Sequence, residues 1–250
     1  LAQIEDLLLL CDDEGVRTRL DVGFFPHVHN RVSLEQLGSA QLLTFAGAPH
    51  DDFRLIVKRL TDFIIALTAL IFFSPFMLLI ALAIRLSSPG PALFCQQRCG
   101  LNGRRFTFYK FRTMVDNAEQ LKESLAYLNV KKTAFKIPND PRVTRLGWWL
   151  RKFSLDELPQ LVNILRGEMA IVGPRPPVPS EVAEYERWQR RRLRMRPRLT
   201  CLWALGGRDP LDFAEWLKLD LAYIDTWSLR LDWSIMLRTF PYVLSGKGAH

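Results

Sequence analysis

Two adjacent carboxylates, Asp156 and Glu157, are the side chains in this sequence best suited to chemistry. They lie in the segment RKFSLDELPQ (residues 151–160), close to the cations Arg151 and Lys152. Neighbouring carboxylates can hold a divalent cation such as Mg²⁺, which prefers oxygen ligands and is usually shared with substrate phosphates. An aspartate can also accept a phosphoryl group in covalent catalysis. The segment is therefore a candidate for metal-assisted attack on an electrophile.

The same segment has a structural interpretation. Ser154 precedes Glu157 by three residues, which matches the spacing of a helix capping box. In that case Asp156 and Glu157 would only complement the dipole of the following helix. The spacing alone favours this structural alternative over a catalytic one.

The positions of the histidines and cysteines limit which side chains could act as catalytic groups or zinc ligands. The four histidines are His27, His29, His50 and His250, so none lies between residues 58 and 249. Acid–base or nucleophilic work in that region must then rely on carboxylates with a metal, on cysteine or on serine. Cys95 and Cys99 lack a second Cys/His pair downstream, so we expect no zinc site there.

Cations accompany the carboxylates in three segments. Residues 106–112 read as a strand in which Lys110 and Arg112 alternate with aromatic residues, after a hairpin turn at residues 102–103. Arg175 lies in GPRPP, where prolines stiffen the loop and suit a preorganised phosphate contact, although a surface turn is the alternative. The arginine-rich run at residues 187–198 predicts an interfacial helix on anionic lipid, with a solvated helix face or a nucleic-acid contact as alternatives.

Residues 63–84 form a run of 22 residues without a charged side chain. About 20 apolar residues match the thickness of a bilayer core, so the run predicts a membrane helix. A buried core helix is the alternative, but globular helices of this length nearly always have a polar face.

Ser74 and Pro75 lie near the middle of this run. Proline removes a backbone donor and clashes with the preceding turn, so we expect a kink or break there, with the Ser74 hydroxyl bonding a freed carbonyl. Lys58 and Arg59 precede the run and further arginines follow it, and cationic flanks prefer the cytoplasmic side. We therefore expect a re-entrant helix over residues 55–88, with a kinked spanning helix as the alternative.

The composition divides the chain. Of the 250 residues, 48% are hydrophobic and 24% are charged, which excludes a disordered chain, and the net charge of +8 suggests anionic partners. Residues 1–57 carry a net charge of −5, whereas residues 58–250 carry +13. We therefore place a domain boundary near residues 54–58. Upstream of it, residues 7–10 read as a helix, and residues 16–21 and 41–45 read as strands.

Six motifs occur in order: Lys58–Asp62 with the Ser-Pro-interrupted run, YKFRTM (109–114), NDPRVT (139–144), SLDELPQ (154–160), GPRP (173–176) and WSLRLD (227–232). Together they resemble the bacterial sugar transferase family, the monotopic polyprenyl-phosphate glycosyl-1-phosphate transferases, over about residues 55–250. The acidic residues 1–54 resemble the C-terminal remnant of the extra α/β domain of large members that build exopolysaccharide, capsule or O-antigen. We therefore expect an N-terminally truncated chain.

The resemblance implies a reaction. A sugar-1-phosphate would pass from a nucleotide diphosphosugar, such as a UDP-hexose, to undecaprenyl phosphate, and the nucleotide monophosphate would leave. Asp156 would be the nucleophile that forms a phosphosugar–enzyme intermediate, assisted by Glu157, and both carboxylates would bind Mg²⁺. The candidates for a cationic cradle around the phosphates are Lys110, Arg112, Arg151, Arg175 and Arg208.

The resemblance also implies a fold and a location. We expect a mixed, helix-rich α/β catalytic domain over residues 89–250, joined to the re-entrant helix and carrying interfacial amphipathic helices. The domain would lie on the cytoplasmic face of the bacterial inner membrane. Its partners would be the UDP-sugar, undecaprenyl phosphate and anionic lipids, with a homodimer left open and no nucleic acid.

One segment departs from the family pattern. Arg198, Cys201 and Ala204 stand where the family usually has Gly, Gly and Gln. If those glycines have positive φ, the replacements strain the loop. This departure is the argument for a second hypothesis, a catalytically weak membrane scaffold that binds anionic lipids or partner enzymes, which the intact Asp156 and Glu157 disfavour.

Overall fold

The computed structural model describes residues 31–37, 40–46, 52–128, 137, 140–200 and 213–244. The chain divides into two compact units, Leu1–Phe45 and Ala46–His250. In the N-terminal region, strand β1 (Arg31–Leu37) pairs with strand β2 (Ala40–Ala46). β2 confirms the strand predicted at residues 41–45, whereas β1 was not predicted. The helix expected at residues 7–10 and the strand expected at 16–21 lie outside the described residues.

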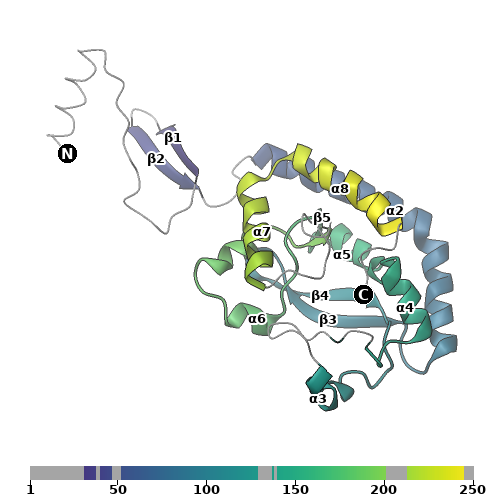
Figure 1. The fold of residues 1–250 in the computed structure, drawn as a ribbon. Coiled ribbons are helices and arrows are strands. Elements are labelled where there is room, and N and C mark those ends of the chain that lie inside the picture. Colours follow the sequence, from purple (N-terminus) through teal and green to yellow (C-terminus); the bar gives the residue numbers. More distant parts are fainter. Residues whose placement is uncertain are drawn as a thin grey trace, which may run out of the picture. The chain divides into compact units, whose positions relative to one another are not determined.

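The membrane segment predicted from sequence is part of one long helix, α2 (Asp52–Ser87), which contains Pro75. Because Pro75 has no N–H, the carbonyl of Ile71 loses its usual partner. The Ser74 hydroxyl donates to that same carbonyl at 3.0 Å, as predicted. The backbone stays helical throughout, and Figure 1 shows α2 as a bent helix that first follows α8 (Leu229–Leu244) and then turns down past α4 (Arg145–Lys152).

The outer surface of α2 is apolar. In the described part of the chain, α2 is the one helix that is long and apolar enough to cross a membrane. Ten of its apolar side chains are more than half exposed: Phe53, Ile56, Leu60, Ile64, Ile71, Phe72, Leu78, Leu79, Leu82 and Leu86. Exposed aromatic side chains continue this character on α4, at Trp148 and Trp149. Such a continuous apolar surface is typical of a membrane-facing or partner-facing region.

The basic hairpin follows α2. Strand β3 (Leu93–Cys99) pairs antiparallel with strand β4 (Arg105–Phe111), with Leu93 opposite Phe111 and Cys99 opposite Arg105. Asn102 and Gly103 both have positive φ, at 56° and 75°. This geometry suits the right-handed twist of a hairpin, so the turn predicted at these two residues is confirmed.

Short elements complete the unit. The remaining helices and strands are α3 (Leu121–Ser124), α5 (Gln160–Arg166), β5 (Ala170–Val172), α6 (Pro179–Ala183), β6 (Arg198–Thr200) and α7 (Phe213–Thr226). The 3₁₀ turns are η1 (Leu101–Gly103), η2 (Ala126–Leu128), η3 (Leu155–Glu157) and η4 (Gln189–Arg194). β5 and β6 pair in parallel. The expected mixed, helix-rich α/β class is therefore confirmed.

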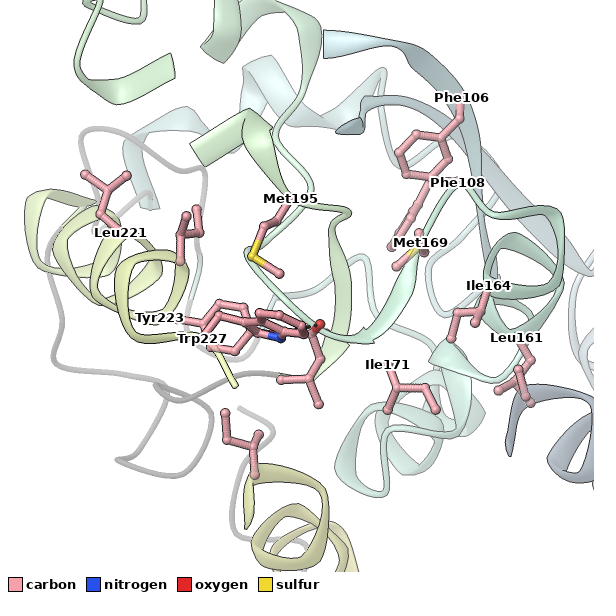
Figure 2. Close-up of a cluster of buried hydrophobic side chains, with 14 of the residues drawn as sticks. Phe106, Phe108, Leu161, Ile164, Met169, Ile171, Met195, Leu221, Tyr223 and Trp227 are labelled. Atoms are coloured by element: carbon pink, nitrogen blue, oxygen red, sulfur yellow. Dashed lines mark hydrogen bonds between the residues drawn. The ribbon is translucent and has the colours of Figure 1, made fainter. Parts of the chain in front are cut away.

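Two apolar clusters hold these elements together. The larger cluster joins the first half of α2, at Ala66, to β4, α5, β5 and α7. Figure 2 shows Phe106, Phe108, Met169 and Ile164 on one side of this cluster and Tyr223 and Trp227 on the other, with Met195 toward the latter. The smaller cluster joins Ile80 and Ile84, in the second half of α2, to Phe111 and Leu150. Leu158 contacts both clusters, so the segment after η3 is packed against the same apolar cores that hold the two halves of α2.

A buried ionic group joins α2 to α8. Lys58 Nζ lies 2.7 Å from Asp232 Oδ2 and 3.3 Å from Asp62 Oδ2, and all three residues are buried. Asp232 also accepts hydrogen bonds from the Tyr223 hydroxyl and the Trp227 indole. Buried charges persist only when they are paired and hydrogen-bonded, and here Asp232 has three donors.

The arginine-rich run does not form one interfacial helix, so that prediction is wrong for this segment. Its helical part is the short turn η4, and Arg192 is 2% exposed, 2.5 Å from Asp220 and 2.9 Å from the Tyr185 hydroxyl. Arg191 pairs with Asp225. These arginines pair with protein groups because the turn packs against α7, so its cations do not share one solvent-facing side.

Arg198 does not have the strained backbone considered from sequence. It lies in strand β6, and its N–H donates to the carbonyl of Pro174 at 3.1 Å. Among the described non-glycine residues, positive φ occurs at Asn102 and Ser154 and not at Arg198. Cys201 and Ala204, the other two departures, lie outside the described residues.

Candidate active site

Asp156 and Glu157 lie in η3, between α4 and α5. Ser154 before them adopts a left-handed backbone with φ of 52°, and its side chain makes no capping hydrogen bond. The Glu157 N–H donates instead to the backbone carbonyl of Ser154 at 3.2 Å. The capping-box interpretation is therefore wrong, because a capping side chain needs an extended backbone at that position. Left-handed, non-glycine residues are strained and concentrate at functional sites.

Lys110 of β4 reaches both carboxylates. Its ammonium lies 2.8 Å from Glu157 Oε1 and 3.4 Å from Asp156 Oδ2. The Lys110 side chain is 28% exposed and that of Glu157 26%, whereas that of Asp156 is only 9% exposed. The structure thus brings together the proposed nucleophile, its carboxylate neighbour and one cation from the predicted cradle.

Burial raises the pKa of Asp156 above its ordinary value, and the charge of Glu157 raises it further. Lys110 and Arg151 oppose this rise because their positive charges favour the ionised carboxylate. Burial also lowers the pKa of Lys110, but Glu157 and Asp156 outweigh that effect and leave the pKa of Lys110 raised. Lys110 is therefore a firmly charged partner for a carboxylate whose charge is disfavoured by its surroundings.

Arg151 approaches the same site from α4. The Thr144 hydroxyl accepts the Gly147 N–H at 2.9 Å and caps this helix. Gly147 lies so close to the carbonyl of Thr113 that a Cβ would not fit. This contact lets Arg151 Nε donate to Thr113 Oγ1 at 2.9 Å. Burial lowers the pKa of Arg151, while the nearby charge of Asp156 opposes the change.

Arg112 is occupied elsewhere. It is 7% exposed, and its guanidinium donates to the carbonyl of Pro89 and to the carbonyl and hydroxyl of Ser88. These groups directly follow the last turn of α2. These hydrogen bonds fix the end of α2 to the end of β4, and the described ion pair of Arg112 is with Asp116 and not with Asp156 or Glu157.

Arg175 belongs to a second cluster of charges. Its backbone N–H donates to Asp220 Oδ2 at 3.3 Å, and its guanidinium lies 3.3 Å from Glu181 and over the ring of Trp216. The neighbouring Arg98 donates to the Pro176 carbonyl at 2.9 Å, and burial, with a smaller effect of Arg175, lowers its pKa to about 10. The described contacts of Arg175 are with this cluster and not with Asp156.

Of the remaining predicted site residues, two are described by the structure and one is not. Ser74 and Pro75 lie within α2, as described above. Arg208 lies outside the described residues. The structure therefore groups Lys110 and Arg151 with the two carboxylates, and places Arg112 and Arg175 in other contacts.

Asn163 is a supporting residue that the sequence reasoning missed. Its side-chain amide donates to the Thr107 carbonyl at 2.7 Å and to Glu168 at 2.6 Å, and its oxygen accepts the Tyr109 N–H at 3.3 Å. These bonds fix α5 along β4, the strand that carries Lys110. A polar amide among the apolar residues of α5 could have indicated this role.

The donor set for a metal is small. Among the described residues, no group of three or more His, Cys, Asp or Glu side chains gathers around one point. Mg²⁺ is usually held by one or two carboxylates together with substrate phosphates and waters. Asp156 and Glu157 fit that kind of site, provided that the substrate supplies further oxygen ligands.

Comparisons with known proteins identify the family of the chain. The profile of the family described as "Bacterial sugar transferase" matches residues 53–246. The galactosyl transferase CpsE of Streptococcus agalactiae serotype III is 38% identical over 257 residues, which cover 99% of this chain and 56% of that protein. The exopolysaccharide production protein ExoY of Sinorhizobium fredii is 42% identical over 200 residues, which cover 78% of this chain and 88% of that protein.

A third relative is the UDP-glucose:undecaprenyl-phosphate glucose-1-phosphate transferase of Xanthomonas campestris pv. campestris. It is 35% identical over 261 residues, which cover 99% of this chain and 51% of that protein. The chain thus spans about half the length of the streptococcal and Xanthomonas relatives and most of the length of ExoY. The profile covers more than three quarters of the chain, including the carboxylate pair, and the chain belongs to the bacterial sugar transferase family.

Proposed function

We propose that this protein transfers a sugar-1-phosphate from a UDP-hexose to undecaprenyl phosphate, as the first membrane step of exopolysaccharide, capsule or O-antigen synthesis. The observation that carries the proposal is the buried Asp156 beside Glu157, with Lys110 in contact with both. The name of the Xanthomonas relative supplies the donor and the acceptor. The streptococcal relative is named for galactose instead, so the hexose is left open between glucose and galactose.

In the first step, a carboxylate oxygen of Asp156 attacks the phosphorus that carries the sugar. A new O–P bond forms, the bond from that phosphorus to the bridging oxygen breaks, and UMP leaves with the electron pair. In the second step, a phosphate oxygen of undecaprenyl phosphate attacks the same phosphorus. The bond to Asp156 breaks, the carboxylate is regenerated, and the sugar remains attached to the lipid through a diphosphate.

Positive charge must offset the meeting of these anions. Lys110 contacts the carboxylates directly, and Arg151 lies close enough to stabilise the charge of Asp156. Cations positioned before the reaction stabilise developing charge without further reorganisation. When bound by Asp156 and Glu157 together with substrate oxygens, Mg²⁺ would supply further charge neutralisation at the phosphates.

We place the site at the cytoplasmic face of the bacterial inner membrane, with α2 as a re-entrant helix. A bent helix with an apolar outer surface supports this arrangement. The segment after η3 belongs to the same two apolar clusters as α2, so entry of α2 into the lipid would hold the carboxylates near the headgroups, where the acceptor phosphate lies.

The test is turnover in membranes with a panel of UDP-sugars and undecaprenyl phosphate. We expect a labelled phosphosugar to be trapped on the wild type and to be absent on Asp156→Asn. Because burial raises the pKa of Asp156, its ionised form disfavours the folded state at neutral pH, so the Asn variant should be at least as stable there. That advantage should vanish below about pH 4, near the ordinary carboxyl pKa. Wild-type turnover by the variant would refute the nucleophile assignment.

A further inference from the structure

We propose that Gln160 is a substrate-binding residue whose side-chain amide donates a hydrogen bond to an oxygen of the phosphoryl group that is transferred through Asp156. The inference rests on the proposed function and adds a specific contact to it. Two observations on the described residues carry it: the position of Gln160 relative to Asp156, and the lack of a partner for its buried amide nitrogen.

The backbone connects the two residues through one tight turn. Leu158 and Pro159, which connect η3 to α5, both have right-handed helical dihedral angles. The Leu158 N–H donates to Leu155 O at 3.3 Å, and the Leu161 N–H donates to Leu158 O at 3.1 Å. Both hydrogen bonds span three residues, so this connection has the tight geometry of a 3₁₀ turn, in which side chains four apart do not share one face. Gln160 therefore begins α5 a little more than one turn after Asp156.

The segments before and after this turn, η3 and α5, both contact β4. Asp156 contacts Lys110 at one end, and Asn163 bonds to the Thr107 carbonyl and the Tyr109 N–H at the other. Gln160 lies between them in sequence and is 2% exposed. Residues three apart in a helix are neighbours, so Gln160 lies next to Asn163, in the layer between α5 and β4 and four residues after the reacting carboxylate.

Within the described part of the chain, the buried amide nitrogen of Gln160 has no hydrogen-bond partner. A buried, unsatisfied amide disfavours folding, and native structures satisfy nearly all such groups. Asn163, three residues later on the same face, makes three hydrogen bonds and shows that this layer can satisfy an amide. An orphaned donor beside a nucleophile is therefore a group that a ligand completes.

The chemistry of the donor selects the ligand. The amide nitrogen offers hydrogen atoms and no negative charge, so it suits an anionic oxygen beside a site already crowded with carboxylates. A phosphoryl group bonded to Asp156 carries such oxygens a little more than one turn from Gln160. Hydrogen bonds to charged acceptors are stronger than those between neutral groups, so this contact would strengthen as the phosphoryl group arrives.

The test compares Gln160→Met, which keeps the shape but removes the donor, with the matched Asn163→Leu. For each we would measure the melting temperature, the rate of phosphosugar trapping and kcat with the preferred UDP-sugar. Gln160→Met should melt at or above the wild-type temperature yet form the intermediate at least about tenfold more slowly. Asn163→Leu should melt lower, because it leaves the Thr107, Tyr109 and Glu168 groups unpaired.

Trapping by Gln160→Met at the wild-type rate would overturn the inference, as would a lower melting temperature with activity lost only in proportion to folded protein. If the Met variant does not fold, Gln160→Asn, which keeps the amide but withdraws it by one methylene, should show the same slow trapping. Failure of the wild type itself to form an intermediate would refute the proposed function instead.

Discussion

Lys110 contacts both Asp156 and Glu157, and its removal should change the pH dependence of activity. Lys110 lowers the pKa of Asp156 against the effect of burial. Lys110→Met should therefore raise the pKa of Asp156 further, and the acidic limb of the kcat/KM profile should move to higher pH. Lys110→Arg, which keeps the charge, is the control. An acidic limb at the same pH in Lys110→Met would show that Lys110 does not tune the nucleophile.

Arg175 can be tested against an exposed arginine. If Arg175 leaves Glu181 to meet a substrate phosphate, Arg175→Ala should lose about 1.5–3 kcal/mol of transition-state stabilisation. Arg187 is exposed in the basic run, and Arg187→Ala should lose no more than about 1 kcal/mol. The comparison is kcat/KM in the same membranes. Arg191 is a poor control, because it pairs with Asp225. Equal losses would remove Arg175 from the phosphate contacts.

Single residues also show which parts of the site could be predicted from the sequence. The carboxylate pair and Lys110 were predictable because their residue types restrict the possible chemistry. The role of Arg112 was not, because β4 ends at Phe111 and the alternation that would align Arg112 with Lys110 ends there as well. The capping box predicted at Ser154 was wrong because spacing alone does not determine backbone conformation. The spacing of Ser154 and Glu157 fits a cap, but the backbone of Ser154 is left-handed.

At the scale of elements, the bend in α2 depends on Ser74 and Pro75. Replacing both by alanine gives the Ile71 carbonyl its backbone N–H donor at position 75 again, so the helix should straighten. A straight helix of 36 residues is about 54 Å long at about 1.5 Å per residue, enough to cross a core of about 30 Å. We expect the variant to place one end of α2 on the far side of the membrane and to lose activity.

Impermeant cysteine labelling of intact cells can measure this topology. Phe53 and Leu86, near the two ends of α2, are 74% and 79% exposed and suit single replacements by cysteine. The background would have the four native cysteines replaced by serine, after its turnover has been checked. Protection of both positions in the wild-type helix and labelling of one in the Ala-Ala variant are expected. Labelling of one position in the wild-type helix would mean that α2 spans the membrane.

Some helices and turns could be predicted from the sequence, and others could not. The hairpin turn at Asn102-Gly103 and the long apolar helix were predicted because their signals are local. The arginine-rich run was predicted wrongly, because its partners Asp220 and Asp225 lie in a helix distant in sequence. A basic segment looks uniformly exposed until the acidic groups that face it are known.

For the whole molecule, the Lys58–Asp232 pair holds together residues that are 174 positions apart. Lys58→Met should destabilise the protein by about 3–5 kcal/mol, because it leaves Asp62 and Asp232 buried without their cation. The double variant Lys58→Met/Asp232→Asn should lose less than the two single variants together. Thermal inactivation of solubilised protein measures both effects. Additive losses would show that the pair is not energetically coupled.

Arg112 gives the fold a further property. Its guanidinium binds the residues that follow the last turn of α2, and Lys110 lies two residues earlier in the same segment. A helix that is too long or too short for its bilayer tilts or shifts to match the local thickness. In the arrangement proposed here, such a shift would pull on the strand that carries Lys110. Under the proposed function, acyl-chain length in reconstituted liposomes would then change turnover, and the lipid composition of the host membrane would affect polysaccharide output.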